Sequence, residues 1–165
     1  MDAVIGLGSN LGDRLRYLRS AAQELMQIGK VQARSAVYET EPVGGPPQPH
    51  YLNAALWLAT ELLPDKLLGV LHHIERHAGR FRDGERDQPR TLDLDMLLLG
   101  PHGEVVMVTS DLVVPHPRLH ERAFALRPVL DLAPSLVHPA LGVPLSDLLA
   151  SLPRVDHQTQ PIGWL

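Results

Sequence analysis

The chain of 165 residues contains no cysteine. Without a thiol there is no disulfide framework, and neither a thiolate nucleophile nor a thiolate metal site is possible. The sequence also lacks any window of about 18 consecutive apolar residues, the length that a membrane-spanning helix needs. Its start, MDAVIGLGSN, has no basic region followed by a long apolar run, so we expect no signal peptide. These absences predict a cytoplasmic protein that does not enter a membrane.

Lysine is scarce as well, because Lys30 and Lys66 are the only two lysines among 15 basic residues. The formal net charge of −4 argues against a nucleic-acid-binding surface, for which a basic excess is expected. Arginine binds phosphate oxygens with a forked geometry that lysine lacks. Biased codon usage accounts for the overall excess of arginine but not for its local clustering in RFRDGERDQPR. The clustered residues are Arg80, Arg82, Arg86 and Arg90.

Apolar residues make up 44% of the chain and charged residues 21%, as is ordinary for a globular domain. We expect a single domain over residues 1–165 with its own core. Hydrophobic periodicity predicts the order strand, helix, strand, strand, helix, strand, which is the ferredoxin-like pattern. The predicted fold is therefore α+β, with a ferredoxin-like βαββαβ core, a mainly antiparallel sheet, helices packed on it and a C-terminal elaboration. The predicted elements span 3–8, 13–29, 31–40, 51–61, 64–79 and 90–100.

The C-terminal elaboration carries weaker patterns. The run VVMV predicts a strand within 104–109, and the valines at 113–114 end at the rigid turn Pro115-His116-Pro117. Helices are predicted over 118–129 and 146–152.

The stretch RTLDLDMLLLG, from Arg90 to Gly100, places two aspartates inside a strongly apolar strand. Like charges about 7 Å apart on one strand face repel each other, unless a hard cation such as Mg²⁺ lies between them. The alternative is an exposed edge strand with a polar face, which the flanking apolar run disfavours. Because side chains alternate along a strand, one face is predicted to hold Thr91, Asp93, Asp95 and Leu97. The opposite face is predicted to hold Leu92, Leu94, Met96 and Leu98.

The charged segment 81–89 has two interpretations. Arginine alternating with acid is typical of a solvated loop. Because this segment leads directly into Asp93 and Asp95, its arginines would also suit phosphoryl transfer beside a metal-binding pair. Glu75, near the end of the preceding helix, is either a polar anchor facing this segment or a surface residue paired with an arginine. His73 and His77 do not form the zinc motif H-E-x-x-H, because the glutamate falls one place too late.

The segment Glu41–His50, EPVGGPPQPH, has four prolines and two glycines, so it cannot join a helix or a sheet interior. A semi-ordered loop beside a binding site fits this composition. The run GLGSNLGD lacks the GK[ST] of a P-loop, which favours a tight strand-to-helix turn. His116 is held between two prolines, where a solvated basic turn is the alternative to a functional role. Phe124 is either a core residue or a stacking surface for a flat ligand.

Four blocks of the sequence together resemble one known family. They are GLGSNLGDR, YETEPVG with YLNAA, PRTLDLDMLLLG and VPHPRLHERAFALRPVLDLAP, in the family's order from Gly6 to about Pro134. The family is 6-hydroxymethyl-7,8-dihydropterin pyrophosphokinase, which acts in folate synthesis. The resemblance implies a ferredoxin-like core and transfer of the β,γ-pyrophosphoryl group from ATP to the primary hydroxyl of the pterin. AMP is the other product.

The resemblance also implies residue roles. Asp93 and Asp95 match the ligands of two magnesium ions, consistent with two-metal positioning of the triphosphate. The residues that match catalytic, phosphate-handling arginines are Arg80, Arg82 and Arg90. The implied ATP-binding residues are Glu75, Arg80, Arg82, Arg90 and His116. The implied pterin-binding residues are Thr40, Val43, Tyr51, Asn53, Arg122 and Phe124.

One position departs from the pattern of some family members, because Asp87 stands where they carry tryptophan. This departure bears on how the catalytic loop closes over substrate and leaves the metal pair intact. The general base is open between Asp95 and a metal-bound water. The implied partners are the small molecules ATP and hydroxymethyldihydropterin, without nucleic acid or membrane, and we expect a monomer. A competing hypothesis is a ferredoxin-like binding or regulatory domain without catalysis, which would not need paired metal carboxylates on an interior strand.

Overall fold

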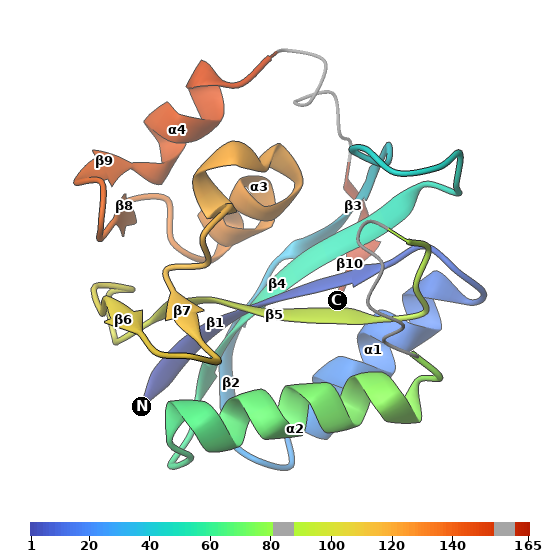
Figure 1. Ribbon diagram of the computed structural model, residues 1–165, viewed down its shortest axis with the longest axis horizontal. Coiled ribbons are helices and arrows are strands. Elements are labelled where there is room, and N and C mark those ends of the chain that lie inside the picture. Colours follow the sequence, from blue (N-terminus) through green and yellow to red (C-terminus); the bar gives the residue numbers. More distant parts are fainter. Residues whose placement is uncertain (81–87, 154–160) are drawn as a thin grey trace.

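The computed structural model describes residues 1–80, 88–153 and 161–165. A twisted sheet lies between two layers of helices (Figure 1). The strands of this sheet are β1 (Asp2–Ser9), β2 (Lys30–Arg34), β3 (Ala36–Thr40), β4 (Tyr51–Ala59), β5 (Asp93–Leu99) and β10 (Pro161–Trp164). Two small hairpins consist of β6 (Met107–Val108) with β7 (Val113–Val114), and of β8 (Val137–His138) with β9 (Val143–Pro144). The α-helices are α1 (Arg14–Leu25), α2 (Pro64–His77), α3 (Ala123–Leu132) and α4 (Leu145–Ser151).

The main sheet has the strand order β10-β3-β4-β1-β5, with β2 paired to β4 beside β3. Every pairing in it is antiparallel. Helix α1 follows β1, and α2 connects β4 to β5. This is the ferredoxin-like βαββαβ arrangement, so the predicted α+β fold class is confirmed.

Residues 31–40, predicted as one strand, form β2 and β3 with a break at Ser35. The buried Ser35 hydroxyl accepts a hydrogen bond from the Ala55 N–H at 2.8 Å and donates to the Ala36 carbonyl at 2.7 Å. The Ser35 hydroxyl thus accepts a ladder hydrogen bond that a backbone carbonyl would otherwise accept. As a result β2 pairs with the second half of β4 and β3 with its first three residues, from Tyr51 to Asn53.

The sheet has a separate hydrophobic core on each face. Helices α1 and α2 cover one face, where Leu18 and Leu71 pack in a cluster with Ile5. Helices α3 and α4 cover the other face, where Leu126 belongs to a cluster with Val4. Figure 1 shows the two helix layers on opposite sides of β1 and β5. Burial on both faces explains why β4 reads as a nearly continuous apolar run.

The prediction for β5 was wrong at one point, because Leu98 lies with the α3-side core rather than with Leu94 and Met96. The pairing of β1 with β5 shifts register between Val4 and Ile5, where a β-bulge adds one residue to β5. An added residue reverses the alternation beyond it. Asp93 and Asp95 precede the bulge, so their shared face is as predicted.

The C-terminal part departs most from the predictions. Only Met107–Val108 of the predicted strand 104–109 is a strand, and α3 begins at Ala123 rather than 118, after a 3₁₀ turn over Leu119–Glu121. Strands β8, β9 and β10 were not predicted. None of the described helices is both long and apolar enough to cross a membrane.

Candidate active site

The centre of the candidate site is the α3-side face of β1, β4 and β5. Gly8 of β1 lies opposite Asp93 of β5 and also opposite Asn53 of β4. A Cβ atom at Gly8 would lie 3.4 Å from Asn53 Oδ1 and 3.6 Å from Asp93 Cβ. A side chain at this position would occupy the space between the carboxylate and the amide, which glycine leaves unfilled.

Asp93 is bound by two arginines. Arg80 donates to Asp93 Oδ1 in a short contact, and Arg90 Nη1 donates to Oδ2 at 2.9 Å. The same guanidinium of Arg80 binds the carboxylate of Glu75, whose side chain is only 1% exposed. Glu75 Oε1 also accepts from the backbone N–H of Leu94 at 2.9 Å. Glu75 is therefore a buried anchor that connects α2, β5 and Arg80, which decides between its two interpretations.

Asp95 lies two residues along the same strand face and has a different environment. Its ring neighbour is His116, with Nε2 at 4.0 Å from Asp95 Oδ2. Burial raises the pKa of Asp95 to about 7, and repulsion from the Asp93 carboxylate adds to the rise, whereas Arg122 opposes it. The repulsion predicted between the carboxylates of Asp93 and Asp95 is thus present in the fold.

His116 is held in place by its backbone and ring. Its N–H donates to the Leu97 carbonyl at 2.9 Å, and its Nδ1 accepts from the Arg118 N–H at 3.1 Å. Burial lowers the pKa of His116 to about 4, and Arg122 lowers it further, so the imidazole is neutral at pH 7. A neutral imidazole offers a directed hydrogen bond rather than a charge.

We expect Asp95→Asn to stabilise the metal-free protein. A pKa of about 7 in the folded state exceeds the ordinary value, so the wild type loses stability as the pH rises from about 4 to about 7. Asparagine does not titrate and avoids this loss. The side chain of Asp95 is 38% exposed, so water screens the effect and the gain at pH 8 should be about 1 kcal/mol. Urea unfolding at pH 5 and pH 8 measures it, and an equal gain at both values would contradict the assignment.

The predicted pterin-binding residues come from β3, β4, the Pro-rich loop between them and the beginning of α3. Asn53 Nδ2 donates to Thr40 Oγ1 at 2.7 Å, and Tyr51 OH lies 3.4 Å from the Gln88 carbonyl. At the beginning of α3, the Arg122 guanidinium lies 5.4 Å from the centroid of the Phe124 ring. Val43, in the Pro-rich loop, is 60% exposed and takes no part in the core. Arg82 and Asp87 lie outside the described residues.

Asn10 was not predicted from the sequence, although it forms part of the GLGSN block. Its Oδ1 accepts from the Arg90 N–H at 2.7 Å, and its Nδ2 donates to Gln48 Oε1 at 2.8 Å and to the Pro49 carbonyl at 3.1 Å. Asn10, a buried residue directly after β1, thus connects the Pro-rich loop to Arg90, which lies shortly before β5. Neither the predicted turn nor the family resemblance of this block assigns a role to Asn10, and the signal that could have found it is an amide that can both donate and accept.

Two other features do not belong to this site. The rings of His73 and His77 lie with their centroids 4.0 Å apart on α2. No group of three or more His, Asp or Glu side chains in the described parts of the chain could hold a metal ion.

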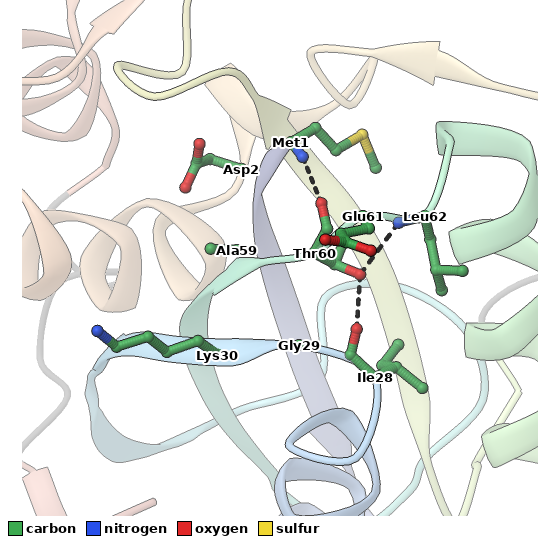
Figure 2. A pocket seen from close by; sticks show the side chains of 9 residues that line it. All are labelled: Met1, Asp2, Ile28, Gly29, Lys30, Ala59, Thr60, Glu61 and Leu62. Carbon is green, nitrogen blue, oxygen red and sulfur yellow. Dashed lines mark hydrogen bonds between the residues drawn. The ribbon is translucent and has the colours of Figure 1, made fainter.

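A hollow of about 650 Å³ lies at the far ends of β1 and β4, beside the start of β2 (Figure 2). It is lined by Met1, Asp2, Ile28, Gly29, Lys30, Ala59, Thr60, Glu61 and Leu62.

Fold and site together define a ferredoxin-like domain with two carboxylates on one face of β5 and two arginines bound to one of them. The family model for 7,8-dihydro-6-hydroxymethylpterin-pyrophosphokinase (HPPK) matches residues 4–134. The chain is 44% identical to 2-amino-4-hydroxy-6-hydroxymethyldihydropteridine pyrophosphokinase of Bacillus subtilis over 132 residues, covering 79% of this chain and 77% of the relative. The chain belongs to the HPPK family.

Longer relatives contain this domain as one part. The chain is 36% identical to "Folic acid synthesis protein fol1" of Pneumocystis carinii, covering 96% of this chain and 21% of the relative. It is 43% identical to "Folate synthesis bifunctional protein" of Arabidopsis thaliana, covering 79% of this chain and 27% of the relative. A crystal structure of Plasmodium falciparum HPPK-DHPS superposes with a TM-score of 0.69 at 15% identity, over 90% of this chain and 42% of that one, which supports the fold alone. The chain thus spans about a quarter of the length of the Pneumocystis and Arabidopsis relatives.

Proposed function

We propose that this chain transfers the β,γ-pyrophosphoryl group of ATP to the hydroxymethyl group of 6-hydroxymethyl-7,8-dihydropterin, giving AMP and the pterin diphosphate in folate synthesis. Membership of the HPPK family supports this reaction. The observation that carries it is the Asp93–Asp95 pair on one face of β5, with Arg80 and Arg90 bound to Asp93. We also propose a monomer of a single domain, because one chain can supply all the residues assigned to the proposed site.

Magnesium is the proposed cofactor, as two ions held by Asp93 and Asp95. The donor set fits, because Mg²⁺ is usually bound by one or two carboxylates together with substrate phosphates rather than by a complete protein cage. The raised pKa of Asp95 also indicates a carboxylate pair that a cation would stabilise. When bound, the ions would neutralise negative charge on the triphosphate as the phosphorus–oxygen bond breaks.

The arginines are proposed to bind the phosphates. Arg80 and Arg90 hold Asp93 in the ligand-free chain, and a triphosphate offers them more negative oxygens at the same place. Glu75 keeps Arg80 beside β5 during this exchange, because its buried carboxylate is fixed by the Leu94 N–H. Neutral His116 is proposed to hydrogen-bond the nucleotide. Arg82 is proposed to bind the phosphates together with Arg80 and Arg90.

The pterin is proposed to lie between β4 and the beginning of α3. Asn53 already donates to Thr40, which orients its amide, and its Oδ1 faces the space that Gly8 keeps clear. That oxygen can accept a hydrogen bond from the pterin edge. Phe124 and Tyr51 would stack against the ring, Arg122 lies over Phe124, and Val43 would close the pocket from the loop.

The reaction can be tested by measuring AMP release from ATP with the purified chain and Mg²⁺. We expect AMP to form only when hydroxymethyldihydropterin is present, and to disappear when EDTA is added. A chain that binds both molecules without releasing AMP would contradict the proposal and favour the non-catalytic binding domain.

A further inference from the structure

A single arginine connects the two ends of the Pro-rich loop 41–50. Arg14 is the first residue of α1, and its Nη1 donates to Glu39 Oε1 at 2.7 Å and to the His50 carbonyl at 2.7 Å. Glu39 lies in β3 just before the loop, and His50 lies just before β4. The guanidinium of Arg14, which extends from α1, therefore holds the two ends of the loop together.

The loop depends on such polar contacts, because none of its ten residues is buried. Gly44 and Gly45 have φ angles of 79° and 76°, a backbone conformation in which few other residues are stable. Asn10 holds the loop at Gln48 and Pro49, and Arg14 holds it at its end. A loop without buried apolar surface is ordered only as far as its hydrogen bonds hold it.

Arg14 is itself placed in advance of any ligand. Asp13 is the N-cap of α1, and its Oδ1 accepts from the Arg16 N–H at 3.2 Å. The cap fixes the first turn of the helix, and thereby the direction in which the Arg14 side chain leaves it. Arg14 is 29% exposed and Glu39 39%, so the ion pair alone should stabilise the fold by less than about 1 kcal/mol.

We propose that Arg14 is a positioning residue for the pterin pocket. By joining Glu39 to His50 it sets the spacing of the neighbouring residues Thr40 and Tyr51, which form the last pair of the β3–β4 ladder. It also limits where the loop can place Val43. This role rests on the proposed function, because it assigns Arg14 to the pterin side of that site and not to the nucleotide side.

The test compares Arg14→Ala, Arg14→Lys and, as matched control, Arg16→Ala, which removes an exposed arginine of the same helix and keeps its capping N–H. Pterin affinity is measured in the presence of Mg²⁺ and a non-hydrolysable ATP analogue, and analogue affinity is measured separately. Arg14→Ala should weaken pterin binding about five- to tenfold with analogue binding within about twofold, which corresponds to about 1 kcal/mol at the loop. Arg14→Lys should recover part of the loss, since an ammonium can reach one of the two acceptors, and Arg16→Ala should behave as wild type.

A second measurement does not depend on catalysis. The ¹⁵N order parameters of Gly44, Gly45 and Gln48 should fall toward about 0.6 in ligand-free Arg14→Ala and stay at the wild-type level in Arg16→Ala. Unchanged order parameters, or an equal loss of pterin and analogue binding, would overturn the positioning role. If the wild-type chain bound the analogue but no pterin, the proposed function would fail, and the order parameters would still decide whether Arg14 holds the loop.

Discussion

Asp93→Ala and Asp95→Ala are each expected to lower kcat/KM for pyrophosphoryl transfer by about 10³-fold or more while the fold stays intact. Removing a carboxylate relieves the repulsion within the pair but takes away a proposed Mg²⁺ ligand. Loss of electrostatic stabilisation at a transferring group typically has effects of about this size. The measurement is AMP release at saturating Mg²⁺, with far-UV circular dichroism to establish folding.

The matched control for this pair is Asp111→Ala, which removes an exposed carboxylate in the turn between β6 and β7. It should keep wild-type activity. Near-normal turnover of both Asp93→Ala and Asp95→Ala would rule out the metal assignment, whatever their stability.

Arg80→Met is expected to lower kcat by about 10²-fold with pterin affinity within about twofold of wild type. Methionine keeps an apolar stem but cannot stabilise charge on the phosphates, and a group that acts mainly in the transition state affects kcat more than binding. Single-turnover kinetics with pre-bound substrates measures this. Equal weakening of ATP and pterin binding, with the chemical step unchanged, would contradict the role.

Arg80→Met also has effects outside catalysis, because the guanidinium holds two carboxylates. Glu75 is 1% exposed, so losing a cationic partner should reduce the free energy of unfolding by about 3 kcal/mol. Asp93 loses one of its cationic partners, so Mn²⁺ without nucleotide should bind more tightly than to wild type. Arg76→Met, a change of an exposed arginine on α2, is the control and should alter neither property.

The sequence predicted the part of the fold that follows simple periodicity. Alternation placed Asp93 and Asp95 on one face of β5, and that face is the one observed. It did not predict the bulge opposite Val4 and Ile5, because a bulge depends on the partner strand. The sequence did not predict the break at Ser35 either, because this break depends on a hydrogen bond from the Ala55 N–H to the Ser35 hydroxyl.

Local patterns predicted the site less completely than the fold. The resemblance selected Glu75 as an ATP-binding residue, which stays a prediction, and the structure shows a buried carboxylate that joins α2, β5 and Arg80. Asn10 and Arg14 each connect segments more than 20 residues apart in the chain, and no local pattern predicts such contacts. Strand β10 was missed because its four residues pair with β3, far away in sequence.

Product analysis by ³¹P NMR tests the central proposal most directly. The chain is incubated with Mg²⁺, ATP and hydroxymethyldihydropterin, and the phosphorus signals are followed over time. We predict equal amounts of AMP and of a pterin ester that carries two coupled phosphorus atoms, with neither product formed by Asp95→Ala. Formation of ADP with a pterin monophosphate, or release of AMP and free diphosphate regardless of the pterin, would contradict pyrophosphoryl transfer at this site.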